Sequence, residues 1–228
     1  MAKLVIIRGN SGSGKSSLAK KLQAYYGRGT LLIAQDTVRR DMLKEKVEPG
    51  NLSIDLTETL ARFGYEHDLL VLVEGFYETD IYGHMLERLR TLFGPQTLAY
   101  YYDLTFEETV RRHQTLAKQE EFAPADMRRW WKDRDFLGWE EESFFRDEDS
   151  LEAAFERIVQ DLEKIWNEAQ EEELLCFCIK KAFSEILNKF WEKYHTKCWQ
   201  NYFIGLQLDY KIFLLLQSEG FKEYILVG

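Results

Sequence analysis

The chain has 228 residues and a formal net charge of −9 at pH 7, with an isoelectric point of about 5.1. This length can form one α/β domain with a filled core and leaves some residues over. The negative charge argues against a surface that coats nucleic acid, because phosphate backbones are bound by dense lysine and arginine patches. No apolar run reaches the roughly 18 residues that a membrane span needs, and the N-terminus lacks a secretory signal pattern. We therefore expect a cytoplasmic protein with no membrane partner.

An apolar segment, a glycine-rich loop and an amphipathic segment open the chain. Residues 3–8 (KLVIIR) carry a run of aliphatic side chains, which is typical of a strand buried on both faces of a parallel sheet. Residues 15–26 place Leu18, Leu22 and Tyr25 at helical spacing, which predicts a helix. The order predicted is strand, loop and helix.

The loop between this strand and helix matches the phosphate-binding pattern G-x-x-x-x-G-K-[ST]. Its glycines let backbone N–H groups turn inward, Lys15 can reach the β- and γ-phosphates, and Ser16 can offer a hydroxyl to Mg²⁺. The positive end of the helix adds to the attraction, whereas a purely structural turn is the disfavoured alternative. The residues expected to bind the nucleotide are Gly9, Asn10, Ser11, Gly12, Ser13, Gly14, Lys15, Ser16 and Ser17.

Nucleotide binding alone does not separate kinases, GTPases and motor ATPases. The chain has no Asn-Lys-x-Asp element for reading guanine, and Val-Glu-Gly-Phe at residues 73–76 stands where a GTPase has its Asp-x-x-Gly switch. We therefore expect ATP with Mg²⁺ as the bound nucleotide, and a regulatory ATPase stays open as an alternative.

The second predicted strand, residues 30–34, is followed by predicted helices at residues 36–44 and 52–65. Residues just beyond the carboxyl ends of parallel strands line the ligand crevice, so Asp36 is expected to face the phosphates. There it can accept the proton of an attacking hydroxyl, and Arg39, one turn later, can hold the acceptor or a phosphate. The alternative for Asp36 is an ordinary helix N-cap.

Residues 69–74 form the third predicted strand, and residues 82–93 the amphipathic helix after it. Glu74 ends this strand beside the phosphate-binding loop. We expect its carboxylate to hold Mg²⁺ through water or to orient the acceptor, with a surface glutamate as the alternative.

A fourth strand is predicted at residues 97–103 and a helix at residues 106–116. Thr105 can cap this helix, and Glu108 is placed to complete a capping box. Asp103, at the end of the strand, is a weaker candidate for the site than Asp36 or Glu74.

Cations recur from Arg112 through residues 114–139, a segment dense in arginine, lysine and tryptophan. One proline and little strand character predict a helical lid there. Lid arginines can stabilise the charge that spreads over a transferring phosphoryl group, and Arg112 is the first candidate, with pairing to nearby carboxylates as the alternative. Tryptophans of the lid can stack on a base or sugar, although packing against the core is favoured: Trp130, Trp131 and Trp139.

A short edge strand at residues 143–146 and a helix at residues 151–166 complete a domain predicted to span residues 1–170. Beyond an acidic run the composition changes, and residues 174–194 show helical periodicity. We expect residues 171–228 to form a mainly helical appendage of unknown role. Its cysteines lack zinc-site spacing and are expected to be buried free thiols: Cys176, Cys178 and Cys198.

Three blocks of the sequence resemble the small ATP-binding P-loop kinases that include zeta toxins, chloramphenicol phosphotransferase and the kinase module of polynucleotide kinase. These blocks are GNSGSGKSS at residues 9–17, QDTVRR at residues 35–40 and YYYDLTFEETVRRH at residues 100–113. The resemblance spans about residues 3–166. It implies an α/β P-loop NTPase fold with three layers, a doubly wound parallel sheet of strand order about 2-3-1-4-5, and a helical lid.

The resemblance also implies roles for single residues. Asp36 becomes the general base, Arg39 a contact to the acceptor or phosphate, and Arg112 a lid contact. We therefore expect an ATP-dependent phosphotransferase that acts on a hydroxyl of a small molecule or a nucleic-acid end, the latter disfavoured by the net charge. A nucleotide-dependent regulatory or binding module is the alternative, and the oligomeric state is left open.

Overall fold

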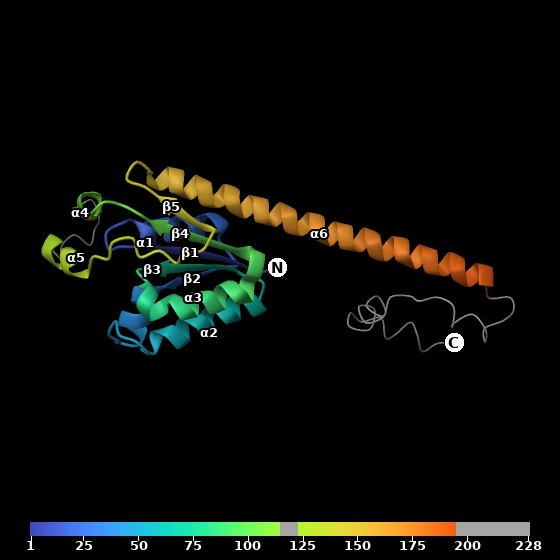
Figure 1. Cartoon of the computed structure of the whole chain (residues 1–228), viewed down its shortest axis with the longest axis horizontal. Helices are drawn as coiled ribbons and strands as arrows, with labels where there is room; N and C mark the ends of the chain where they lie inside the picture. Colours follow the sequence, from blue (N-terminus) through green and yellow to red (C-terminus); the bar gives the residue numbers. More distant parts are fainter. Residues whose placement is uncertain (115–122, 195–228) are drawn as a thin grey trace. The chain divides into compact units, whose positions relative to one another are not determined.

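The structure, a computed structural model, describes residues 1–114 and 123–194 (Figure 1). The chain divides into two compact units, Met1–Glu171 and Glu172–Gly228. The first unit contains the sheet, the phosphate-binding loop and every residue predicted for the site. The second unit is helical as far as residue 194, and its remaining residues lie outside the described part.

A five-stranded parallel sheet forms the centre of the first unit. Its strand order is β2-β3-β1-β4-β5, so the predicted fold class is confirmed. The shortest strand, β5, lies at one edge, as the sequence predicted. The strands are β1 (Lys3–Gly9), β2 (Thr30–Ala34), β3 (Leu70–Gly75), β4 (Thr97–Tyr102) and β5 (Glu142–Phe145).

Helices cover both faces of the sheet (Figure 1). One face packs against α1 (Lys15–Tyr26) and the start of α6 (Leu151–Tyr194), and the other against α2 (Ser53–Glu66) and α3 (Thr79–Phe93). Two shorter helices follow β4 in the chain, α4 (Phe106–Gln114) and α5 (Pro124–Trp130), and a 3₁₀ turn, η2 (Gly94–Gln96), precedes that strand.

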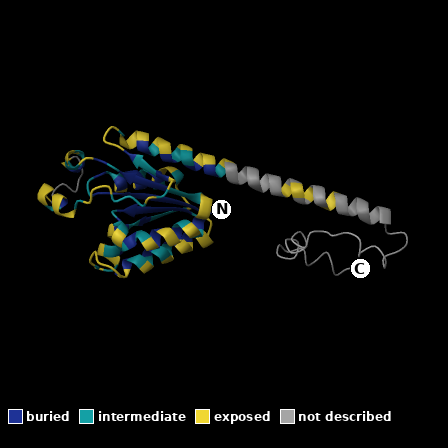
Figure 2. Ribbon diagram, viewed as in Figure 1, coloured by how far each residue is buried: buried dark blue, intermediate teal, exposed yellow. Residues whose placement is uncertain are grey.

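Side-chain alternation along β1 explains the two apolar cores. Leu4 and Ile6 pack on the α2 and α3 side, whereas Val5 and Ile7 pack on the α1 and α6 side. All four side chains are fully buried, because successive residues of a strand point to opposite faces and helices cover both. Figure 2 shows the buried strands between helices that are buried only on their inner sides.

Two predicted helices differ from the observed ones. The helix expected at residues 36–44 is a single π-helical turn, η1 (Thr37–Met42), which ends before Lys44 adopts a left-handed backbone conformation (φ 57°). The helix expected at residues 82–93 begins earlier, at Thr79. Its first N–H donates to the side chain of Asp135, a partner from a distant segment that sequence periodicity does not reveal.

The start of α4 is capped by a partner that the sequence analysis missed. The hydroxyl of Thr105 accepts a hydrogen bond from the N–H of Glu108 (3.2 Å), as predicted. The second half of the predicted capping box is wrong, because the N–H of Thr105 donates to Asp147 (2.8 Å) while Glu108 binds Arg111 and Arg112.

The last helix is longer than the sequence analysis predicts. The sequence favours an end near residue 166 and a separate helical segment from residue 174, whereas α6 continues without interruption to Tyr194. Residues 167–194 contain no glycine or proline, so no strong helix breaker separates the two segments. No helix in residues 1–114 and 123–194 is long and apolar enough to cross a membrane.

Part of the predicted lid and tail is outside the described structure. Residues 115–122 of the lid are not described, and neither are the side chains of Cys176 and Cys178 or any part of Cys198. The predicted buried thiols therefore stay a prediction.

Candidate active site

The glycine-rich loop joins the end of β1 to the start of α1. Gly12 has a positive φ of 82° and would place a Cβ 2.8 Å from the carbonyl oxygen of Thr109, so a larger residue would be both strained and crowded. Gly14, just before α1, also has a left-handed conformation (φ 102°). This backbone path brings the loop's peptide groups around the N-terminus of α1, the arrangement expected to bind phosphate.

Lys15 is the first residue of α1, directly after this loop, and is only 8% exposed. Its ammonium donates to the carbonyl oxygen of Asn10 (2.8 Å) and to the hydroxyl of Ser13 (3.2 Å). Burial lowers the pKa of Lys15 to about 8, while the carboxylates of Glu74 and Asp36 act in the opposite direction. Both carboxylates predicted for the site therefore lie close enough to Lys15 to interact with its charge.

Ser16 and Glu74 present two oxygen groups side by side. The hydroxyl of Ser16 donates to the carboxylate of Glu74 (3.2 Å), and Glu74 is 5% exposed. Burial raises the pKa of Glu74, an effect opposed by the ammonium of Lys15 and the hydrogen bond from Ser16.

This pair fits Mg²⁺ chemically, because Mg²⁺ takes oxygen ligands and keeps several waters. Within residues 1–114 and 123–194, no group of three or more His, Cys, Asp or Glu side chains is arranged to hold a metal ion. A magnesium ion at Ser16 and Glu74 would thus complete its coordination with phosphate oxygens and water, as it does in nucleotide sites.

Asp36 and Arg39 lie just beyond the carboxyl end of β2, Asp36 directly before the π-helical turn η1 and Arg39 within it. The guanidinium of Arg39 donates to the carboxylate of Asp36 (3.0 Å), whose side chain is 60% exposed. Asp36 makes no side-chain cap to the turn, so the capping alternative is wrong. Single π-helical turns often occur at functional sites, and this turn leaves the carboxylate available to solvent.

Arg112 extends from α4 to the phosphate-binding loop. Its guanidinium donates to the carbonyl oxygen of Ser13 (3.3 Å), to Glu108 (2.6 Å) and to the carbonyl oxygens of Asp147 (3.1 Å) and Asp149 (3.0 Å). The guanidinium groups of Arg111 and Arg112 hold the pKa of Glu108 down to about 2. Arg112 therefore joins α4 and the β5–α6 loop to the phosphate-binding loop, or P-loop, at residues 9–17.

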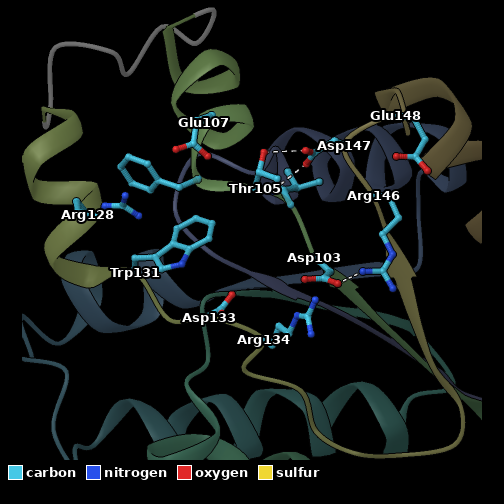
Figure 3. Close-up of a pocket in the computed structure, with 12 residues that line it drawn as sticks. Asp103, Thr105, Glu107, Arg128, Trp131, Asp133, Arg134, Arg146, Asp147 and Glu148 are labelled. Carbon is cyan, nitrogen blue, oxygen red and sulfur yellow. Dashed lines mark hydrogen bonds and ion pairs between the residues drawn. The ribbon is translucent and has the colours of Figure 1, made fainter.

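A separate cavity of about 780 Å³ opens at the carboxyl ends of β4 and β5 (Figure 3). Asp103, the weaker candidate of the sequence analysis, lines it and pairs with Arg146. The ring of Phe106 lies beneath the guanidinium of Arg128 (4.1 Å) and meets Trp131 edge to face (5.3 Å between centroids). Lys15, Asp36 and Glu74 do not line this cavity.

The three lid tryptophans have different surroundings. Trp139 packs against the core on the α2 and α3 side, and Arg90 lies over its ring (4.9 Å). Trp131 contacts Phe106, and Trp130 is 43% exposed.

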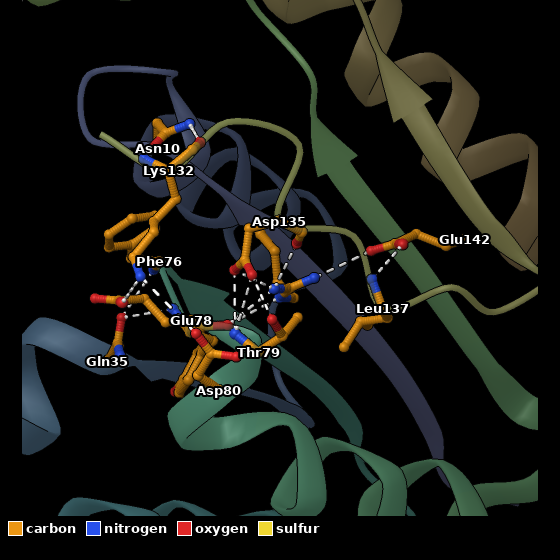
Figure 4. A network of polar contacts seen from close by, with 12 residues as sticks. Asn10, Gln35, Phe76, Glu78, Thr79, Asp80, Lys132, Asp135, Leu137 and Glu142 are labelled. Carbon is orange, nitrogen blue, oxygen red and sulfur yellow. Dashed lines mark hydrogen bonds and ion pairs between the residues drawn. The ribbon is translucent and has the colours of Figure 1, made fainter. Parts of the chain in front are cut away.

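A buried network behind the phosphate-binding loop was not predicted (Figure 4). Arg8, the last residue of β1 before Gly9, is fully buried and donates to the carboxylates of Asp135 (2.9 Å) and Glu142 (3.2 Å). Asp135 also accepts from the N–H of Thr79 (3.1 Å). The one local signal was an arginine at the end of an apolar strand, and it gave no indication of partners more than 120 residues away.

Asn10 also has a role that the loop motif does not specify. Its side-chain amide donates to the carbonyl oxygen of Lys132 (2.7 Å) and accepts from the N–H of the same residue (3.0 Å). The ammonium of Lys132 lies 3.2 Å from the carboxylate of Glu78. The first variable position of the P-loop is thereby bound to the α5–β5 loop, residues 131–141.

The sheet order, the loop after β1 and the helices on both faces define the fold of the P-loop kinases. No model of a known protein family matches the chain, and no curated protein matches it in sequence. The chain is similar in structure to a gluconokinase from Sinorhizobium meliloti 1021, with 14% identity, a TM-score of 0.50 and coverage of 75% of this chain and 97% of that one. It is also similar to the APS kinase CysC from Mycobacterium tuberculosis, with 16% identity, a TM-score of 0.54 and coverage of 71% and 98%. At these identities the likeness shows the fold.

Proposed function

We propose that the protein transfers the γ-phosphoryl group of MgATP to a hydroxyl group of a small molecule, with Asp36 as the general base. The observation that carries the proposal is the placement of Asp36. It is an exposed carboxylate at the carboxyl end of β2, it acts on the charge of the P-loop lysine, and it is not used as a helix cap. The similar structures named as kinases support a phosphotransferase.

The proposed reaction is a single phosphoryl transfer. The acceptor oxygen forms a bond to the γ-phosphorus while the bond from that phosphorus to the β–γ bridging oxygen breaks, and ADP leaves with the electron pair. Asp36 takes the proton of the acceptor hydroxyl. Lys15 stabilises charge on the β- and γ-phosphates, and Arg39 orients Asp36 or binds the acceptor.

Ser16 and Glu74 would hold Mg²⁺, which when bound neutralises charge on the phosphates. Arg112 supports the loop at Ser13 and is proposed to contact the nucleotide from the lid side. The acceptor is a small molecule in this proposal, as in part of the family that the sequence blocks resemble. A nucleic-acid end is the less favoured acceptor because of the net charge of −9.

The experiment that tests the base is phosphoryl transfer from labelled ATP to a panel of hydroxyl compounds by the wild type and Asp36→Asn. We expect Asp36→Asn to bind MgATP normally and to lose at least about 100-fold in transfer, since general-base catalysis contributes about that much or more. Asp41→Asn is the matched control, because Asp41 is an exposed aspartate at the end of the same turn. Equal transfer by Asp36→Asn and the wild type would exclude Asp36 as the base.

A second candidate is a nucleotide-dependent regulatory or binding module. Phe177 and Ile179 of α6, in the second unit, are 63% and 60% exposed, so both side chains are available to contact a partner. ATP binding without phosphorylation of any compound in a broad metabolite panel would favour this candidate over the kinase.

A further inference from the structure

The side chain of Asn10 fixes the backbone of Lys132 at the phosphate-binding loop. Asn10 is 4% exposed, and its amide satisfies both the N–H and the C=O of Lys132. The carbonyl oxygen of Asn10 meanwhile accepts from the ammonium of Lys15. One P-loop residue therefore contacts Lys15 with its backbone and Lys132 with its side chain.

The loop that carries Lys132 is held at further points. Asp135 is bound by Arg8 and by the N–H of Thr79, and the N–H of Leu137 donates to Glu142 (2.7 Å). Because these contacts fix the backbone, the position of Lys132 is set by the sheet and the P-loop. Its side chain is 45% exposed and therefore has room to change partner.

The ammonium of Lys132 reaches the carboxyl end of β3. It lies 3.2 Å from Glu78 and 3.9 Å from Asp80, and Glu78 directly precedes α3. In the sheet, β3 lies between β1, which carries the P-loop, and β2, which leads to Asp36. The ammonium of Lys132 thus lies at the segment that joins β3 to α3, while its backbone is bound to the phosphate-binding loop.

The ion pair between Lys132 and Glu78 is weak enough for the Lys132 ammonium to change its partner. Partly exposed ion pairs contribute little to stability, so little is lost when the ammonium leaves Glu78. A phosphoryl group in transfer carries charge on three equatorial oxygens and offers a stronger partner. Lys132 is held against the phosphate-binding loop through the side chain of Asn10 and is thereby available as a second cation beside Lys15.

We propose that Lys132 is a second catalytic lysine, which moves from Glu78 to the oxygens of the transferring γ-phosphoryl group, and that Asn10 is the residue that positions it. This inference rests on the proposed function. The bonds made and broken are those of the transfer above, and in the absence of an acceptor a water molecule takes its place and Asp36 receives the water proton.

The test uses the full chain, with MgATP and no added acceptor, and compares Lys132→Gln with the wild type. We expect the Kd of MgATP to change by less than about threefold and the slow rate of ATP hydrolysis to fall by about tenfold or more, as for loss of one contact made in the transition state. Lys132→Arg should recover part of the rate, because arginine keeps the charge. Arg134→Gln, an exposed position in the same loop with no ion pair among the described residues, is the matched control and should hydrolyse ATP at the wild-type rate.

Asn10→Ala tests the positioning role separately. It should lower the rate of ATP hydrolysis as Lys132→Gln does. The double variant Asn10→Ala/Lys132→Arg should hydrolyse ATP as slowly as Asn10→Ala alone. Thermal unfolding of each variant separates a lost contact from a lost fold.

The outcomes distinguish the two proposals. A wild-type rate in Lys132→Gln, with Lys15→Met inactive, would overturn the role of Lys132 and leave the kinase proposal intact. Absence of ATP binding and turnover in the wild type would overturn both.

Discussion

Burial of the Lys15 ammonium lowers its pKa to about 8, against the opposing effect of the carboxylates of Glu74 and Asp36. The charged form is the one that binds phosphate, so affinity for ATP should follow the protonation of this lysine. We expect the Kd of MgATP to be nearly constant from about pH 6.5 to 7.5 and to rise as the pH passes about 8, because ATP binding must then be accompanied by uptake of a proton. Calorimetry in buffers of different ionisation enthalpy measures that uptake.

The control for this prediction is Lys15→Met, which should bind ATP weakly at every pH. A Kd that stays constant in the wild type at alkaline pH, well above the pKa of Lys15, would contradict the assigned pKa.

The second prediction concerns Glu74. Its carboxylate is buried and bonded to Ser16, so Glu74→Gln should keep the hydrogen bond and remove the charge that attracts Mg²⁺. We expect the Mg²⁺ concentration needed for half-maximal ATP turnover to rise about tenfold, without a fall in Tm. A Mg²⁺ titration checks this, and an unchanged midpoint would remove Glu74 from the proposed metal site.

The residues that were predictable from sequence are those whose chemistry is local. Lys15 and Ser16 are specified by a contiguous pattern, and in the structure they begin α1 directly after the glycine-rich loop. Asp36 and Glu74 could be proposed for the site from the sequence because they lie at the ends of apolar strands, and the ends of parallel strands meet at one edge. The contacts of Arg8 and Lys132 were not predicted, because their partners are distant in sequence and only the folded chain brings them near.

At the scale of elements, the α5–β5 loop and the N-terminus of α3 depend on one carboxylate. Asp135 neutralises the fully buried Arg8 and also binds Thr79. Removing Asp135 leaves Arg8 paired with Glu142 but takes away its hydrogen bonds to Arg8 and to the N–H of Thr79, and losing hydrogen bonds to a charged group costs about 1.5–3 kcal/mol. We expect Asp135→Ala to lower the free energy of unfolding by that amount in urea denaturation.

Asp133→Ala is the matched control, because Asp133 is an exposed aspartate two positions earlier in the same loop. It should change stability by less than about 0.5 kcal/mol. Equal stability of the two variants would show that Glu142 alone compensates Arg8.

The boundaries of the strands and helices were predicted with different success. Strands were located well because short apolar runs between glycine and polar residues leave few alternatives. The start of α3 was placed three residues late, since Thr79 owes its helical position to Asp135 rather than to its neighbours. The π-helical turn at Thr37–Met42 was expected as an ordinary helix, because no periodicity separates the two over so few residues.

At the scale of the whole chain, the apolar cores of the described structure are formed within residues 2–166. We propose residues 1–170 as the catalytic domain, and both the P-loop and Asp36 belong to the unit Met1–Glu171. A chain ending at Glu171 should therefore fold with a Tm within about 3 °C of the full chain, which corresponds to less than about 1 kcal/mol for a domain of this size. Circular dichroism and titration with a fluorescent ATP analogue measure both properties.

A chain ending at residue 150 is the control for this prediction. It lacks the part of α6 that covers one face of the sheet, including Ala154, Ile158 and Leu162, each at most 1% exposed. Truncating a single buried Ile or Leu costs about 2 kcal/mol or more, and losing the whole helix exposes the β1 and β4 side chains beneath it. We expect the shorter chain to be unfolded, whereas the chain ending at Glu171 binds ATP like the full chain. If the chain ending at Glu171 were unfolded as well, the second unit would contribute to the stability of the first, and a domain boundary near residue 170 would be wrong.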